Sequence, residues 1–315
     1  MKKILTLTVN PAIDKSTSVQ GIRPNSKLRC SRPFYNAGGG GINVSRAIKK
    51  LGGESLSIYM AGGPPASLLK DLIEEESVEQ HQIETKEWTR ENLAVVDTTT
   101  EQQYRFGMPG PEVTEKEWRE ALEILEQKLG EEDYLVASGS LCPGIPDDFY
   151  GKVAEIARKK KARLILDTSG EALLKGVKDG VYLLKPNLGE LSALSGEKSL
   201  SSLKLETIGR KLLREGTCEV LVVSLGEKGA ILLTQDACEH IPAPAVHKKS
   251  TIGAGDSMVA GMVLSLAMGR SLSDVARYGV ACGTAATTKE GTQLCTKKDA
   301  DELYEWIKMQ PRMAD

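Results

Sequence analysis

Short apolar segments alternate with segments of helical periodicity along most of this chain of 315 residues. Ile4–Val9 is almost wholly apolar, as expected of a buried strand, and Ile42–Leu51 has apolar residues at helical spacing. The pattern then repeats, predicting strands at Ser55–Met60, Gln80–Thr85, Tyr134–Ala137, Leu164–Leu166, Tyr182–Leu184 and Val220–Val223, and helices at Pro65–Glu76, Thr114–Leu129 and Pro146–Lys160. This order predicts an α/β fold with a doubly wound, mostly parallel sheet flanked by helices.

Two regions interrupt the alternation. Residues 16–35 and 93–108 carry Thr, Val, Tyr and Phe at period two, with no helical segment inside either region. Such a pattern predicts strands, here antiparallel strands forming a small β-sheet lid beside the main sheet. From Gly253 to Lys308 the pattern is almost wholly helical. Because the chain shows no linker, low-complexity tract or internal repeat, we expect residues 1–315 to form one domain with the lid inserted.

Composition narrows the classes of partner. Only 4% of residues are aromatic and the formal net charge is −2 with dispersed basic residues, which argues against nucleic-acid binding and favours a small-molecule function. No apolar run approaches the roughly 18 residues of a membrane span, and Met1-Lys2-Lys3 leads straight into a strand-like segment without the pattern of a signal peptide. The six cysteines and three histidines lack metal-binding spacing, so we expect reduced thiols in a cytoplasmic protein.

The stretch Ser250–Met258, STIGAGDSM, places two glycines and an aspartate at the start of an apolar helical run. Free N–H groups and the helix dipole at such a start both favour phosphate, and the Asp256 carboxylate can take a proton from a hydroxyl. The pattern therefore favours a phosphoryl-transfer site in which Asp256 activates the acceptor. A turn followed by a capping aspartate would leave the same pattern.

The predicted strands give this segment a location. In open α/β sheets the ligand lies beyond the carboxyl ends of the strands. Polar or glycine-rich segments are expected at these ends at Asp14, Gly38–Gly41, Ser138-Gly139-Ser140, Asp167-Thr168-Ser169, Lys185-Pro186-Asn187 and Ser224-Leu225-Gly226. The fold alone does not require so many, and they indicate a binding site at this edge.

Further residue patterns fit a phosphate donor and an anionic acceptor. The glycines of Gly38–Gly41 would let the backbone approach a ligand, or would simply make a flexible turn; the Walker pattern is absent. Four cations that suit phosphate, or merely an exposed surface, lie in or beside the lid: Lys27, Arg29, Arg90 and Arg105. Asn187 and Glu190 offer oxygens suited to Mg²⁺, although Asn187 also fits a helix cap.

Two motifs bring these observations together. They are Ala37–Val44, AGGGGINV, and Thr251–Ser257, TIGAGDS. Because of the order and spacing of these two motifs, the sequence resembles the ribokinase-like carbohydrate kinases of the phosphofructokinase B family along essentially its whole length. Further segments similar to the bacterial 6-phosphofructokinases of that family are Lys27–Cys30, Trp88–Arg90, Gln103–Phe106, Ser138–Leu141 and Asp167–Leu173.

The resemblance implies an ATP-dependent kinase. Its expected acceptor is fructose 6-phosphate, phosphorylated at the 1-hydroxyl, with tagatose 6-phosphate and fructose 1-phosphate as alternative acceptors. Asp256 would be the general base, and the amides of Gly253, Ala254 and Gly255 the anion hole. An alternative from another functional class is a non-catalytic regulator that binds sugar phosphate or nucleotide. The presence of Asp256 argues against it, because binding alone would not need a base there.

The resemblance also implies the binding residues. Those expected to hold the acceptor are Asp14, Lys27, Gly39, Asn43, Arg90, Ser138 and Gly139. Those expected to hold ATP are Lys185, Asn187, Ser224, Gly226, Gly229, Thr251 and Gly283, with Glu190 organising Mg²⁺ through water. Because the lid of the family commonly joins two subunits, a homodimer is expected, in which Lys27 reaches the acceptor from the lid or from the neighbouring subunit.

Many members of the family bind a monovalent cation beside the anion hole, mainly through backbone oxygens. The matching positions here are Ser250, Ile252, Ala286, Lys289, Gly291 and Gln293. Lys289 and Gln293 depart from the phosphofructokinase pattern, in which Asn and Arg are usual. Backbone ligands would preserve a K⁺ site, whereas an ammonium of Lys289 that reached the site would replace the cation; the expectation is activation by K⁺.

Overall fold

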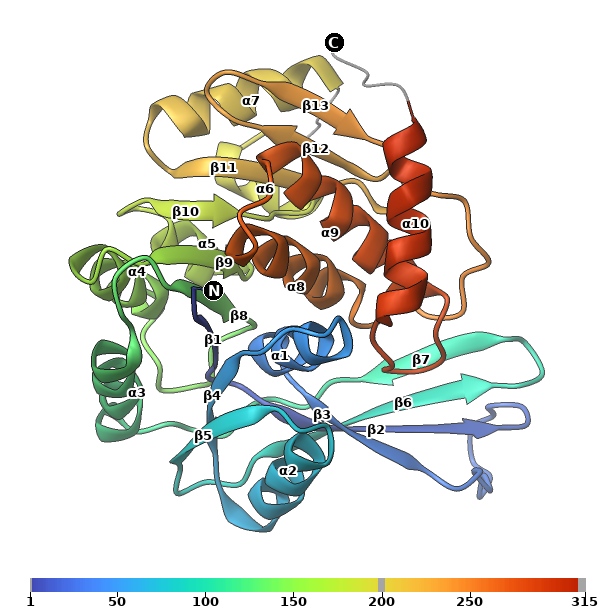
Figure 1. Ribbon diagram of the computed structural model, residues 1–315. Helices are drawn as coiled ribbons and strands as arrows, with labels where there is room; N and C mark the ends of the chain where they lie inside the picture. Colours follow the sequence, from blue (N-terminus) through green and yellow to red (C-terminus); the bar gives the residue numbers. More distant parts are fainter. Residues whose placement is uncertain (1, 198–201, 311–315) are drawn as a thin grey trace.

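The computed structural model describes residues 2–197 and 202–310, in which a nine-stranded sheet lies between helical layers and a four-stranded sheet lies beside it (Figure 1). The strand order of the large sheet is β13-β12-β11-β10-β9-β8-β1-β4-β5. Its parallel strands are β1 (Ile4–Thr8), β4 (Leu56–Ala61), β5 (Glu79–Glu84), β8 (Tyr134–Ser138), β9 (Arg163–Asp167), β10 (Val181–Leu184) and β11 (Cys218–Ser224). All strands predicted from the alternating pattern are therefore confirmed.

The sequence pattern did not reveal the antiparallel edge of this sheet. It consists of β12 (Ala230–Leu233) and β13 (Cys238–Ile241), each paired antiparallel to the strand before it. Both are only four residues long, and between β11 and β12 the chain forms a single 3₁₀ turn, Gly226–Lys228, rather than an α-helix. The strand β10 is equally short and is among the predicted strands, so length alone is not the reason. The prediction relies on strands that alternate with helical segments, whereas β12 and β13 follow one another through turns, and two of the four residues of β13 are polar.

Helices cover both faces of the large sheet (Figure 1). One layer contains α3 (Glu115–Lys128), α4 (Phe149–Lys159), α5 (Gly170–Gly176), α6 (Leu188–Ser195) and α7 (Ser202–Arg214). The other contains α1 (Gly40–Lys50), α8 (Ala254–Ala267), α9 (Leu272–Thr287) and α10 (Lys297–Met309). α2 (Gly63–Glu75) packs in a third cluster beside β4 and the small sheet. None of the described helices combines the length and the apolar character that crossing a bilayer requires.

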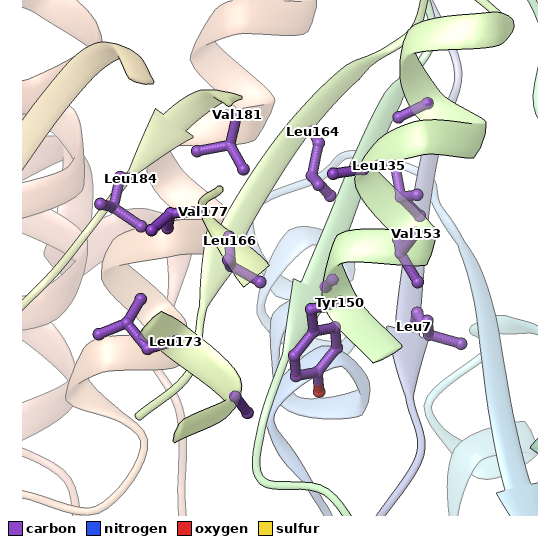
Figure 2. Packing of buried hydrophobic residues seen from close by; sticks show 14 of the residues in the cluster. Leu7, Leu135, Tyr150, Val153, Leu164, Leu166, Leu173, Val177, Val181 and Leu184 are labelled. Carbon is purple, nitrogen blue, oxygen red and sulfur yellow. The ribbon is translucent and has the colours of Figure 1, made fainter. Parts of the chain in front are cut away.

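Strand residues alternate between two buried faces. Leu135 and Leu164 point into the layer that contains Tyr150 of α4 (Figure 2), whereas their neighbours Val136 and Ile165 belong to the cluster beneath α8 and α9. Burying one such side chain stabilises the fold by about 1.5–3 kcal/mol. Since both faces are buried, a one-residue slip would exchange two packed sets of side chains, and the strand register is strongly specified.

The helix α8 is buried from Ser257 to Ala267 because it lies among the sheet, α1 and α9. The crossing with α9 is close: a Cβ on Gly261 would lie 2.6 Å from the sulfur of Cys282. Asp256 lies in the first turn of this helix, just before the buried stretch. The packing of α8 thus fixes where the Asp256 carboxylate lies.

The small sheet has the order β3-β2-β6-β7, with β2 (Ala12–Val19), β3 (Phe34–Gly38), β6 (Arg90–Asp97) and β7 (Gln102–Phe106). The expected antiparallel pairing holds for β2 with β3 and for β6 with β7, but it is wrong for the central pair, because β2 and β6 run parallel. Between β3 and β6 the chain passes through α1, β4, α2 and β5. This long crossover lets β6 enter in the same direction as β2.

Candidate active site

The carboxyl ends of the central strands meet the N-termini of α1 and α8. A Cβ on Gly40 would overlap the hydroxyl of Ser138 at the end of β8, and one on Gly41 would lie 2.6 Å from the carbonyl oxygen of Leu7 in β1. The glycines at these two positions therefore let α1 sit directly on the strand ends. Gly40 and Gly41 thus serve the packing of α1 on the sheet, and the approach of this glycine backbone to a ligand stays a prediction.

Asp256 receives a hydrogen bond from another segment of the site: Asn43 Nδ2 on α1 donates to Asp256 Oδ2 at 2.9 Å. Burial raises the pKa of Asp256 to about 6, and the charge of Asp167 acts in the same direction, while the bond from Asn43 and the Lys185 ammonium oppose both. A carboxylate that titrates near neutrality is suited to act as a general base. The structure thus gives Asp256 the properties expected of the base, and its role stays a prediction.

Lys185 follows β10 and is buried, with its Nζ 3.1 Å from Asp167 Oδ1. Burial alone would lower the pKa of this ammonium, but the Asp167 carboxylate holds it above its usual value. A Cβ on Gly255 would lie 3.8 Å from the same Nζ. A fixed positive charge therefore lies beside the N-terminus of α8, where an anion is already favoured by the helix dipole.

The predicted anion hole lies at the start of α8. Gly253 is the N-cap residue with φ 73°, a conformation that glycine adopts without strain, and its carbonyl accepts the N–H of Ser257 at 2.8 Å. The N–H of Ala254 points back to the carbonyl of Thr251 at 3.5 Å, a long contact. First-turn amides have no acceptor within a helix, so N–H groups at this position could bind an anion, and the anion hole stays a prediction.

A cavity of about 320 Å³ lies between the small sheet and the segment before α8. It is lined by Asp14, Asn92 and Arg105 of the small sheet and by Ile252 and Thr292. Asp14 lies within β2 rather than after β1, which corrects the expected strand-end position. The chain turns at Asn10-Pro11 and enters the small sheet at once, so Asp14 faces the site from the lid.

Asp14 is held by its neighbours on the small sheet. Asn92 Nδ2 donates to Asp14 Oδ1 at 2.9 Å, and a Cβ on Gly38 would overlap the Asp14 carboxylate. Burial raises the pKa of Asp14, while the bond from Asn92 and the nearby arginines, beginning with Arg46, lower it. A carboxylate fixed in this way is suited to accept hydroxyl protons of a sugar.

The other predicted acceptor residues are placed in different ways. Ser138 is buried at the end of β8, and the Gly139 N–H donates to the carbonyl of Asp167 at 3.0 Å. The Arg90 guanidinium donates to the carbonyls of Asn10 at 3.0 Å and Met108 at 2.9 Å. Arg90 thus joins the turn after β1 to the end of β7. Lys27 lies in the exposed segment between β2 and β3, and Gly39 begins α1 as its N-cap.

A second cavity of about 680 Å³ lies on the other side of the α8 N-terminus. Five of the predicted ATP residues line it together: Ser224, Gly226, Gly229, Thr251 and Gly283. Ala254 and Gly255 of the predicted anion hole line it as well, with Met258 and Val280 as apolar walls. Its volume lies in the range of pockets that bury small-molecule ligands.

Asn187 and Glu190 bind each other. The Glu190 N–H donates to Asn187 Oδ1 at 2.9 Å, and the Asn187 N–H donates to Glu190 Oε2 at 2.8 Å. This is a capping box at the start of α6, so the alternative of a helix cap is present. Burial raises the pKa of Glu190, opposed by the Asn187 bond and by Lys185. Lys185 therefore lies close enough to Glu190 for its charge to lower the pKa of that carboxyl.

The predicted cation positions cluster around the segment before α8. The Ser250 hydroxyl donates to the carbonyl of Gly291 at 2.7 Å. Lys289 Nζ lies 2.5 Å from Asp299 Oδ2 near the start of α10, so its ammonium is already paired. Ala286 is buried in α9, Ile252 is partly buried and Gln293 is exposed. The pairing of Lys289 with Asp299 favours the alternative in which backbone oxygens remain available.

The residue patterns left several polar contacts of the site unassigned. Arg46 lies three residues after Asn43, on the same face of α1, and Asn92 lies two residues after Arg90, on the same face of β6. These spacings are the only signals for them in the sequence, and they do not distinguish a functional role from an ordinary polar face. Thr292, in the loop before α10, carries no signal at all.

The arrangement of strand ends, helix N-terminus and two cavities matches a known family. Residues 5–299 match the pfkB family carbohydrate kinase. The chain belongs to the pfkB family of carbohydrate kinases. Its sheet flanked by helices and its small second sheet form the ribokinase-like fold, also found in a ribokinase of Thermotoga maritima at a TM-score of 0.76 and 21% identity over 97% of this chain and 100% of that chain.

Members of the family with assigned names are similar over their whole length. The chain is 41% identical to the ATP-dependent 6-phosphofructokinase isozyme 2 of Escherichia coli over 309 residues, covering 98% of this chain and 99% of that protein. It is 33% identical to the 1-phosphofructokinase of Bacillus subtilis, covering 97% and 99%. A crystal structure of the Escherichia coli phosphofructokinase-2 in complex with potassium has a TM-score of 0.95 at 40% identity, covering 98% and 100%.

Replacing Asp256 with Asn should stabilise this kinase at neutral pH. Because the pKa of the carboxyl rises from 3.8 to about 6 on folding, the folded state binds the proton more tightly than the unfolded chain. The ionised carboxylate therefore costs stability above about pH 6, and the cost disappears as the pH falls below about 4. The free energy of unfolding of Asp256→Asn should exceed that of the wild type at about pH 7.5 and approach it near pH 4.

The matched control is Asp236→Asn, which removes a carboxylate from the exposed turn between β12 and β13. Chemical unfolding monitored by circular dichroism measures both variants. Equal effects of the two substitutions, or a stabilising effect of Asp256→Asn that grows on acidification, would show that folding does not raise the pKa of Asp256.

Proposed function

We propose that the protein transfers the γ-phosphate of ATP to the 1-hydroxyl of D-fructose 6-phosphate, acting as one kinase domain with the small sheet as its lid. The observation that carries the proposal is Asp256, which has a pKa near 6 and lies at the helix start between two cavities. The name of the Escherichia coli relative supports fructose 6-phosphate as acceptor. The name of the Bacillus subtilis relative keeps fructose 1-phosphate as an alternative, and tagatose 6-phosphate remains one as well.

In this proposal the acceptor occupies the cavity lined by Asp14. The carboxylate of Asp14, the amide of Asn43 and the backbone at Gly39 hold its hydroxyls, while its phosphate meets Arg90, Ser138, Gly139 and Lys27. Arg105, which lines the same cavity, adds a second fork of donors for a phosphate. The sugar is thus oriented between cations at one end and Asp256 at the other.

Asp256 takes the proton of the attacking hydroxyl, and the oxygen then forms its bond to the γ-phosphorus as the bond to the ADP oxygen breaks. The amides of Gly253, Ala254 and Gly255 stabilise charge that develops on the transferred group, an effect worth about 3–4 kcal/mol in other enzymes. The Lys185 ammonium adds a fixed charge beside Gly255. Proton removal and charge stabilisation thus act from one helix turn.

ATP fits the cavity of about 680 Å³, whose walls combine glycines with the side chains of Thr251, Met258 and Val280. Lys185 and Asn187 lie at the strand end beside it, where Asn187 pairs with Ser224. The Glu190 carboxylate uses Oε2 for the cap bond and offers its other oxygen for waters of Mg²⁺, a cation that prefers oxygen ligands. Mg²⁺ supplies neutralisation of the phosphate charge when it is bound.

A coupled assay of ADP release tests the function. We expect the highest kcat/KM with fructose 6-phosphate, compared with tagatose 6-phosphate, fructose 1-phosphate and unphosphorylated fructose.

Asp256→Asn should lower kcat by about 100-fold or more with little change in KM, because it removes the base and leaves the binding contacts. Asp236→Asn serves as the control and should leave kcat unchanged. If no acceptor leads to ADP release, the alternative of a non-catalytic regulator is supported instead. A near-normal kcat of Asp256→Asn would show that Asp256 is not the general base.

We also propose that K⁺ activates the enzyme through backbone oxygens near Ser250, Ile252, Ala286, Lys289, Gly291 and Gln293. The Escherichia coli phosphofructokinase-2 has been crystallised in complex with potassium, and the Lys289 ammonium of this chain is held by Asp299. Exchanging KCl for tetramethylammonium chloride at equal ionic strength should lower kcat. Asp299→Asn releases Lys289 and should weaken the response to K⁺. A rate that is indifferent to the exchange would remove the cation from the proposal.

A homodimer through the small sheet is the proposed assembly. Phe34 lies on the edge strand β3 of this sheet and is 71% exposed, and an edge strand presents N–H and C=O groups that can pair with another chain. Sedimentation velocity should show a dimer, and Phe34→Asp should produce monomers. Met309→Asp, at a 79% exposed position at the end of α10, is the control. The Escherichia coli phosphofructokinase-2 has a tetrameric inhibited form. For this chain, an unchanged sedimentation coefficient of Phe34→Asp would place the interface elsewhere.

A further inference from the structure

Arg46 is a buried charged side chain on α1 that contacts β3 of the small sheet and Glu76 at the end of α2. It lies on α1, is 2% exposed and lines neither of the two cavities. Its Nη2 pairs with Glu76 Oε1 at 2.5 Å, and its Nη1 donates to the carbonyl of Ala37 at 2.5 Å. Burying a guanidinium is costly unless its donors are satisfied, so these partners account for how the charge is tolerated but not for why it is there.

A further bond connects Arg46 to the site. Arg46 Nη1 donates to Asn43 Oδ1 at 3.2 Å, and Asn43 Nδ2 donates to Asp256 Oδ2 at 2.9 Å. An amide side chain has one accepting end and one donating end, whereas a guanidinium only donates. Once the guanidinium holds the oxygen of Asn43, the nitrogen of that amide must face Asp256. The reverse orientation would place an amide oxygen against a carboxylate.

We propose that Arg46 is a positioning residue of the kinase, which fixes the amide of Asn43 so that Asn43 holds one oxygen of Asp256 and leaves the other free for the acceptor hydroxyl. The proposal rests on the proposed function only where it calls Asp256 the base. The orientation of Asn43 itself follows from the hydrogen bonds. Arg46 touches neither substrate nor the reacting atoms and acts through Asn43.

The same guanidinium anchors this contact to the lid. Arg46 Nη2 donates to Asn36 Oδ1 of β3 at 3.3 Å, and Asn36 Nδ2 donates to the hydroxyl of Thr292 at 2.9 Å. One buried charge therefore contacts α1, the small sheet and, through Asn36, the loop before α10. A movement of the small sheet would have to break the hydrogen bonds of Asn36 and Arg46. The position of the lid is therefore coupled to the position of Asp256.

The charges around Asp256 define what the loss of this bond would do. Asp167 on β9 and Asp14 on β2 raise the pKa of Asp256, Lys185 after β10 lowers it, and the side-chain hydrogen bond from Asn43 lowers it as well. Removing Arg46 frees the amide of Asn43 to rotate away, while the three charges stay in place. The pKa of Asp256 should then rise, because a stabilising donor of its ionised form is lost.

Titration of the Asp256 carboxyl in the ligand-free protein tests the inference. The protein is labelled with ¹³C at the aspartate carboxyls, and the NMR signal of Asp256 is the one that is lost in Asp256→Asn. The pKa of Asp256 is then measured in the wild type, Arg46→Met, Asn43→Ala and the double variant. We expect a higher pKa in all three variants, and no further rise when Arg46→Met is added to Asn43→Ala. The same set should lose kcat by about 10- to 100-fold, the cost of a misplaced catalytic group.

Glu76→Gln is the matched control, because it removes the ion pair of Arg46 but leaves an acceptor for it and leaves its bond to Asn43. It should lower stability without moving the titration of Asp256. If Arg46→Met does not fold, Arg46→Lys takes its place and should shift the titration in the same direction by a smaller amount.

An unchanged titration of Asp256 in a folded Arg46 variant would overturn the inference. So would a shift that persists in full on the Asn43→Ala background, since it would come from the charge of Arg46 rather than from the amide. Because the titration needs no substrate, failure of the proposed kinase activity with every acceptor would leave these results readable on their own.

Discussion

Burial of α8 on all sides is the constraint on which the active site depends. From Ser257 onward the helix lies against the sheet, α1 and α9, so its first turn cannot shift without opening the core. That turn carries the backbone amides and the carboxylate of Asp256 at one point. A rigid placement of this kind is what phosphoryl transfer requires, because catalysis there is mostly orientation and charge stabilisation.

Around this fixed turn the polar groups come in opposed pairs. Asp167 pairs with the buried Lys185 and also raises the pKa of Asp256, while Lys185 lowers it. The result is a carboxylate that titrates near pH 6, high enough to accept a proton and low enough to be ionised at neutral pH. The penalty for burying the Asp256 carboxylate is thus only partly offset by one neighbouring charge, that of Lys185, and one hydrogen bond, that from Asn43.

Much of the fold could be predicted because the central strands are buried on both faces. Segments such as Tyr134–Ala137 and Val220–Val223 are therefore apolar without interruption, and they alternate with helices that must cross over. The two motifs that carry the family resemblance also lie where the sheet rule places them. The five predicted ATP residues that line one cavity come from three separate segments, residues 224–229, Thr251 and Gly283, and the fold brings them together.

The remainder depends on contacts that no local pattern contains. The parallel pairing of β2 with β6 follows from the crossover through β5, and Asp14 lies on β2 because the chain turns at Pro11 without a loop. Asn187 and Glu190 showed a spacing that suits both a cap and a metal, and the structure forms the cap. Whether Lys289 reached the cation site depended on Asp299, ten residues further along the chain.

The central claim is that Asp256 faces the hydroxyl that attacks the γ-phosphate. A crystal structure of the protein with fructose 6-phosphate and a non-hydrolysable ATP analogue measures this contact directly. We expect the free oxygen of Asp256 to lie within about 2.6–3.2 Å of the acceptor 1-hydroxyl, with Asn43 still bound to the other oxygen. A complex in which another group holds that hydroxyl, and both oxygens of Asp256 bind only protein donors, would contradict it.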